Sequence, residues 1–65
     1  MDYIIKRVTD NKYLISPEAN TWTENIEEAT RFSKPKAEIV KIQLYSKTKI
    51  LNFVILPVEE PNPEN

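Results

Sequence analysis

The side chains that most often act as general base, nucleophile or metal ligand near neutral pH are histidine and cysteine, and the 65-residue chain contains neither. Glycine is absent as well, which excludes the glycine-rich loops that hold nucleotide phosphates. Catalysis would therefore depend on carboxylates, hydroxyls or lysines alone. We predict that the protein is not an enzyme, with no catalytic residue, no metal site and no cofactor.

The carboxylates, which are the best remaining candidates, are dispersed along the chain. Glu27 and Glu28 are neighbours, so on a helix they would point about 100° apart and would not converge on one atom. Asp10 falls in a predicted turn, and Glu59 and Glu60 lie beside the C-terminal tail. A Ca²⁺ or Mg²⁺ site needs several oxygens clustered in one loop, and no such motif is present.

Charge is unevenly distributed although the chain as a whole carries only −1. Residues 33–49 hold five lysines and one glutamate, whereas residues 17–32 hold one arginine and four glutamates. A basic segment suits either a nucleic-acid surface or an ordinary solvated face, and the acidic overall balance favours the solvated face. Weak nucleic-acid binding is therefore the alternative function, and it would use Lys34, Lys36, Lys41, Lys47 and Lys49.

Three large apolar residues are candidates for contact with a partner. Ile39 and Ile42 lie on the side of the predicted second helix that faces away from its other apolar residues, which are Ala37, Val40, Leu44 and Tyr45. An exposed isoleucine pair on a basic helix indicates a partner surface, although scattered surface isoleucines are also normal. Trp22 is either a binding anchor or, as we favour, part of the core. The predicted partner-binding residues are Ile39, Ile42, Lys34, Lys36, Lys41 and Trp22.

The elements that would position these residues begin with a hairpin. Two β-prone runs, residues 3–8 and 12–16, flank Asp10 and Asn11, as is typical of an antiparallel hairpin. Without glycine, turns that need a positive φ must use asparagine or aspartate, which favours this pair and Asn20. Residues 21–23 form a short third strand or an extended lead into a helix.

Two helices are predicted in the middle of the chain. Asn25 suits the N-cap of the first, residues 26–32, with Glu28 placed to reach back to it and an apolar stripe of Ile26, Ala29 and Phe32. The second helix covers residues 35–47 and begins near a proline. The alternation over residues 41–44 leaves open that part of 38–45 is a strand.

Residues 50–58 predict the final strand. Apolar residues on both faces indicate a strand flanked by others and covered by helices, although Pro57 should make pairing fray or lie at an edge. The fold class is α+β: an antiparallel sheet of three strands, or four with residues 21–23, with two helices on one face, in the order β-β-(β)-α-α-β. Residues 1–58 form the single domain, and 59–65 are a disordered, acidic, proline-containing tail.

Five stretches of the chain form a recognisable order: a Tyr-Ile-Ile-Lys strand at 3–6, a Tyr-Leu strand at 13–14, Trp22, the helix start at 26–32 and the strand at 54–60. In this order they resemble short accessory proteins of Gram-positive phages and prophages, especially staphylococcal ones. The resemblance implies a phage origin and a small α+β fold. It supplies no catalytic or ligand residues.

The chain lacks both a signal-peptide pattern and a run of apolar residues long enough to span a membrane, so we expect a cytoplasmic protein of the host cell. The missing chemistry and the isoleucine pair predict a non-enzymatic protein–protein interaction module. The expected partner is a host or phage protein, and a homodimer is a second partner to consider.

Overall fold

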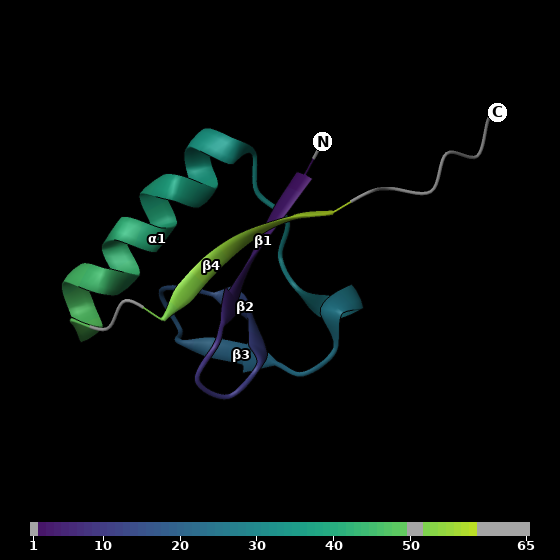
Figure 1. The fold of residues 1–65 in the computed structure, drawn as a ribbon, viewed down its shortest axis with the longest axis horizontal. Helices are drawn as coiled ribbons and strands as arrows, with labels where there is room; N and C mark the ends of the chain where they lie inside the picture. Colours follow the sequence, from purple (N-terminus) through teal and green to yellow (C-terminus); the bar gives the residue numbers. More distant parts are fainter. Residues whose placement is uncertain (1, 50–51, 59–65) are drawn as a thin grey trace, which may run out of the picture.

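The computed structural model describes residues 2–49 and 52–58, which form an antiparallel four-stranded sheet and one α-helix (Figure 1). The strand order in the sheet is β3-β2-β1-β4, and the helix packs against β1 and β4. The elements are β1 (Asp2–Arg7), β2 (Lys12–Ser16), β3 (Thr21–Thr23), the 3-10 turn η1 (Ile26–Glu28), α1 (Lys34–Thr48) and β4 (Phe53–Val58). The third strand and the second predicted helix are thus confirmed, whereas the first predicted helix, over residues 26–32, is reduced to one turn.

The predicted hairpin and its turn residues are confirmed. β1 and β2 pair antiparallel around the turn at Asn11, which has φ 58°, and Asn20 has φ 54° in the turn between β2 and β3. A third positive φ, 60°, falls at Lys49, so the expectation that only asparagine or aspartate would take this conformation is wrong. Lys49 ends α1, where its N–H donates to the carbonyl of Tyr45, and a lysine there also suits the negative end of the helix dipole.

The segment after η1 is extended rather than helical, which corrects the prediction of a helix over residues 26–32. β1 and β2 pair directly only near their turn, and residues 30–32 enter the space where the two strands separate. Phe32 exchanges two backbone hydrogen bonds with Tyr3 of β1, at 2.7 and 2.8 Å, and the Thr30 N–H donates to the Leu14 carbonyl of β2. These strand-type bonds satisfy backbone groups that a helix would have used internally.

The predicted cap of this turn is confirmed at Asn25, whose side chain accepts from the Glu27 N–H at 3.0 Å. Glu28 does not reach the Asn25 N–H directly, as the capping-box pattern suggested. Thr23 stands between them, because its hydroxyl accepts from the Asn25 N–H and donates to the Glu28 carboxylate, both at 3.0 Å. The Thr23 hydroxyl therefore holds η1 to the end of β3.

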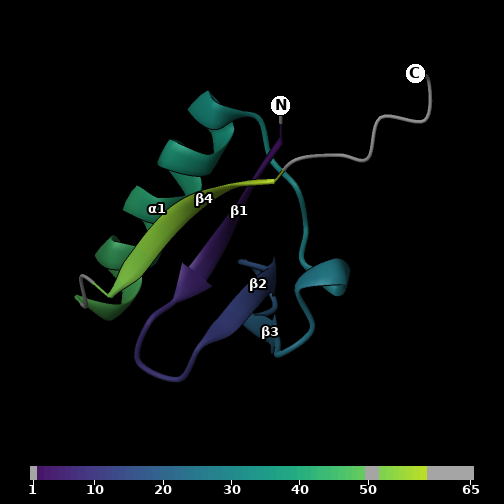
Figure 2. The ribbon, with the colours of Figure 1, turned by 45° about the vertical axis from the view of Figure 1, so that its right-hand side comes forward.

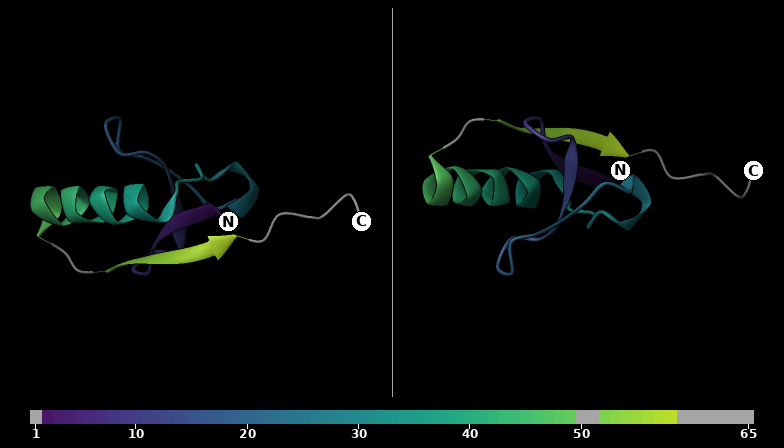
Figure 3. Two further views of the ribbon diagram at one scale, coloured as in Figure 1. Left: turned by 90° about the horizontal axis from the view of Figure 1, so that it is seen from above. Right: turned by 90° about the horizontal axis from the view of Figure 1, so that it is seen from below.

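The helical alternative for residues 38–45 is confirmed, because all of them lie within α1. Ser33 caps the helix by accepting from the Lys36 N–H, and Pro35 occupies the first turn. The prediction of two helices on one face is wrong: α1 and η1 lie on opposite sides of the strands (Figure 2). Seen from above and below, α1 runs alongside β4 (Figure 3).

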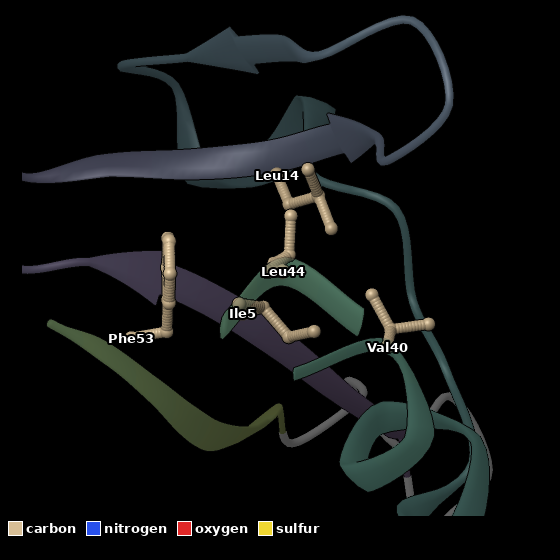
Figure 4. Close-up of a cluster of buried hydrophobic side chains, with 5 residues drawn as sticks. All are labelled: Ile5, Leu14, Val40, Leu44 and Phe53. Carbon is tan, nitrogen blue, oxygen red and sulfur yellow. The ribbon is translucent and has the colours of Figure 1, made fainter. Parts of the chain in front are cut away.

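The core lies between α1 and the face of the sheet that it covers (Figure 4). Val40 and Leu44 from the helix meet Ile5, Leu14 and Phe53 from three strands. Ala37 is buried on the same side of α1, as predicted. Tyr45 was predicted on this inner side too, but its side chain lies at the margin and is 42% exposed.

β4 is an edge strand, which corrects the expectation that it is flanked on both sides. It pairs antiparallel with β1 through the whole run from Phe53 to Val58. Pairing does not fray at Pro57, because Pro57 stands opposite Tyr3 at a position whose backbone N–H would point away from β1. The edge location that the proline indicated is therefore confirmed.

The acidic tail predicted over residues 59–65 lies outside the described residues. Within the part of the chain that the structure describes, no helix is long and apolar enough to cross a membrane.

Candidate functional site

The outer face of α1 carries a row of exposed apolar side chains. Ile39 is 51% and Ile42 66% exposed, which confirms the predicted phase of the helix. Tyr45 continues the row, since the three residues are spaced three apart and successive members are about 60° apart around the helix. Such a row is not needed for the core, because the inner side of α1 already supplies it.

The apolar row leads into an open hollow between α1 and β4, here called the α1/β4 groove. Its volume is about 370 Å³. Four residues of the helix and one of the strand line it: Glu38, Lys41, Ile42, Tyr45 and Ile55. The groove is therefore mainly apolar, with one positive and one negative side chain at its rim.

The backbone of β4 beside this groove has a free outer edge. In an antiparallel pair, every second residue of a strand directs its N–H and carbonyl toward the partner strand. The Val8 N–H donates to the Asn52 carbonyl at 2.7 Å, so Asn52 is one of the residues directed toward β1. Even-numbered residues of β4 consequently bond to β1, while Phe53, Ile55 and Pro57 point their backbone groups outward. Among the described residues no strand pairs with that outer edge.

The five lysines of the basic segment do not gather on one face. Lys34 and Lys41 lie on the flank of α1 that faces β4, and Lys36 and Lys47 lie about 140° away around the helix. Lys34 Nζ is 5.9 Å from the centre of the Tyr3 ring, and Lys41 is half-buried in the groove. Lys47 Nζ donates to the Pro17 carbonyl at 3.3 Å on the other flank.

A second hollow, of about 310 Å³, lies on that other flank of α1. It is lined by residues of the turn after β2 and of the last part of the helix: Pro17, Glu18, Gln43, Leu44, Ser46 and Lys47. The Lys47 ammonium bridges its two walls through the bond to Pro17. This hollow holds no free strand edge, so it offers fewer kinds of contact than the α1/β4 groove.

Trp22 belongs to a different region from the isoleucines. Its ring stacks on Phe53 with centroids 5.8 Å apart, and the Arg7 guanidinium lies 4.2 Å from its centre. Its indole N–H donates to the Asn20 side chain at 2.9 Å. Trp22 is half-buried against the core, so the preference for a packing role agrees with its position.

The Trp22–Phe53 contact also shows how strongly the sheet is curled. The two residues come from β3 and β4, which are the opposite edges of the sheet. In a flat sheet three strand spacings would separate them by about 14 Å. The curl closes one end of the covered face with aromatic side chains.

Arg7 is held over Trp22 by a two-bond ion pair with Asp10, at 2.7 and 2.9 Å. The hydrogen bonds from Arg7 lower the pKa of the Asp10 carboxyl, and the same contact raises the pKa of Arg7. No polar or charged side chain among the described residues is fully buried. In the described ranges no three acidic residues gather where they could hold a metal ion.

The structure brings together only part of the predicted site. Ile39, Ile42 and Lys41 lie on or beside the α1/β4 groove, Lys34 lies on the same flank, and Lys36 and Trp22 lie elsewhere. Sequence reasoning missed Glu38, Tyr45 and Ile55 as lining residues and did not use the strand edge. Pro57 was the signal that could have found it, because a proline in a strand indicates an edge.

Searches against protein-family models, curated proteins and solved structures found no match to this chain.

Proposed function

We propose that this protein is a non-enzymatic interaction module that binds a partner protein through the α1/β4 surface, defined as Ile39, Ile42, Tyr45, Ile55 and the outer edge of β4. The observation that carries the proposal is the continuity of the exposed apolar row with the groove and the free strand edge. A small domain needs nearly all its apolar mass for its core, so large apolar residues left outside in one connected patch favour a binding role.

We further propose that the protein is of phage or prophage origin and acts in the cytoplasm of a Gram-positive host, on a host or phage protein. The support is the likeness of its strand and helix-start motifs to short phage accessory proteins.

The proposal is tested by affinity capture from host lysate with three tagged proteins: the parent chain, the double variant Ile39→Glu/Ile42→Glu and the control Ile26→Glu. Ile26 is a matched control because it is an isoleucine of similar exposure, 49%, that belongs to η1 and does not line the groove. We expect a protein that is captured by the parent and the control and lost with the double variant. Equal capture by all three would refute the proposal, provided circular dichroism shows that all are folded.

Nuclease treatment of the lysate separates this function from the alternative. Nucleic-acid binding through Lys34, Lys36, Lys41, Lys47 and Lys49 would weaken steeply with added salt, because each phosphate contact releases counterions. Capture that survives nuclease and moderate salt favours the protein partner. Capture that depends on nucleic acid favours the alternative.

A further inference from the structure

We infer that the outer edge of β4 accepts an extended acidic segment of a partner protein as a fifth strand, with an apolar side chain of that segment seated in the α1/β4 groove. This inference rests on the proposed function and names the chemistry of the partner.

The backbone of β4 offers the bonds that such a strand needs. Phe53 and Ile55 each point an N–H and a carbonyl outward, and Pro57 points a carbonyl outward. These groups lie on a strand that no other described strand covers. An added peptide would satisfy them with main-chain bonds, which is the mode of recognition known as strand addition.

The groove lies where a side chain of the added strand must go. Directly paired residues on adjacent strands place their side chains on the same face of the sheet. Ile55 lines the groove, so a residue paired with Ile55 places its own side chain there as well, next to Ile42 and Tyr45. The lining of the groove is apolar at this point, which favours a leucine-like side chain.

The charges beside the groove favour an acidic segment. β4 itself carries no charged side chain between Phe53 and Val58. On the facing flank of α1, Lys41 lines the groove and Lys34 lies two turns before it, against the single carboxylate of Glu38. Carboxylates two residues on either side of the seated apolar residue would lie on the same face as these lysines.

A second copy of this chain fits the edge less well. Antiparallel pairing of two β4 strands would place both α1 helices on the same face, with their basic flanks toward each other. Pairing centred on Ile55 would also set Phe53 against Pro57, which has no N–H to donate. Like charges and a missing donor therefore count against self-pairing.

The test uses a synthetic heptapeptide with leucine at its centre, glutamate two residues before and after it, and threonine elsewhere. Binding is followed by the amide signals of the isotope-labelled full chain during titration. We expect the signals of Ile55, Ile42 and Tyr45 to shift, and we expect lysine in place of both glutamates to weaken binding at least about tenfold. A glutamate peptide that leaves these signals unmoved would overturn the inference.

Methylation of single peptide nitrogens tests main-chain pairing. For an antiparallel strand paired at Ile55, the leucine N–H points to β4 and the neighbouring threonine N–H points to solvent. N-methylation at leucine should weaken binding about tenfold or more, while N-methylation at threonine should change it less than about twofold. Equal losses from both would contradict strand addition.

A charge reversal in the protein completes the test. Lys41→Glu should weaken binding of the glutamate peptide and strengthen that of the lysine peptide, whereas Lys36→Glu, the same change on the other flank of α1, should do neither. If the protein forms a dimer that the peptide dissociates, the edge of β4 belongs to a second copy of the chain, and the inference is overturned. If the peptide fails while the Ile39→Glu/Ile42→Glu variant still loses its captured protein, strand addition is refuted and the proposed function stands.

Discussion

Trp22 and Ile42 are both large apolar residues near the margin of the core, yet their surroundings differ. The Trp22 ring contacts Phe53 on one side and Arg7 on another, and its N–H is bonded to Asn20. Ile42 is 66% exposed beside an open groove. At the end of the sheet formed by Trp22, Phe53 and Arg7, called the closed end below, the apolar rings and polar groups contact one another. On the α1/β4 surface, apolar side chains and backbone groups remain available to a partner.

β4 shows the same contrast within six residues. Its first residue, Phe53, is buried and stacked, and its middle residue, Ile55, lies beside the groove with its backbone directed outward. Apolar residues are exposed elsewhere too, such as Val8 and Ile26, but these do not line the groove. Ile42, Tyr45 and Ile55 combine apolar surface with a groove and a neighbouring strand edge, which is why we place binding at α1 and β4.

The largest expected effect is a difference in stability between substitutions on the inner and the outer side of α1. Leu44→Ala removes a side chain that is 3% exposed in the core and should lower the free energy of unfolding by about 3 kcal/mol. Ile42→Ala should change it by less than about 0.5 kcal/mol, because it removes little buried surface and alanine favours the helix. Urea denaturation of both variants measures the contrast.

If Leu44→Ala does not fold, Val40→Ala provides the same comparison at a cost of about 2 kcal/mol. Comparable losses from Val40→Ala and Ile42→Ala would show that the outer face of α1 is part of the stabilising core, against the account given above.

The next effect concerns the closed end. Trp22→Ala should lower the free energy of unfolding by about 2 kcal/mol, less than a fully buried tryptophan would, because the ring is half-buried. The loss reflects its stacking on Phe53 and its contact with Arg7. Thermal denaturation followed by circular dichroism checks this. An unchanged midpoint would mean that Trp22 does not make these stabilising contacts in solution.

The smallest effect is a pH dependence of the closed end. Arg7 lowers the pKa of Asp10 from its ordinary value of 3.8, so their pairing stabilises the fold above that pH and is lost as the pH falls through the lowered value. Asp10→Asn should therefore be less stable than the parent chain at pH 6, with the difference shrinking toward pH 2. Urea midpoints at both pH values measure it, and a difference that grows on acidification would contradict the assignment.

Local patterns in the sequence predicted the elements whose causes are local. The β1–β2 hairpin follows from two β-prone runs around Asn11, and α1 follows from the proline at 35 and the spacing of Ala37, Val40 and Leu44. In these segments propensity, turn chemistry and burial favour the same structure.

Elements determined by distant partners could not be predicted in the same way. Ile26, Ala29 and Phe32 have the apolar spacing of a helix, but the backbone of Phe32 bonds to Tyr3 and that of Thr30 bonds to Leu14. These partners are distant in the sequence, so a local pattern around residues 26–32 carries no sign of them. Lys49 takes a positive φ at the C-terminal end of α1, a position that glycine often fills but that this chain, which has no glycine, gives to a lysine.

The candidate site was predicted in its helical part and missed in its strand part. Ile39 and Ile42 follow from the phase of one helix. The groove also needs Ile55, whose position beside Ile42 and Tyr45 depends on how α1 packs against the sheet. Reading β4 as a central strand hid its free edge, although Pro57 indicated it.

The central claim is that the edge of β4 is open in the free protein, and amide hydrogen exchange tests it most directly. The N–H groups of Val54 and Leu56 bond to β1, whereas that of Ile55 points outward. We predict that Ile55 exchanges at least about a hundredfold faster than either neighbour, because the neighbours exchange only through an opening that costs roughly 3 kcal/mol. Protection of Ile55 equal to that of Val54 would show that the edge is already covered and would contradict the account.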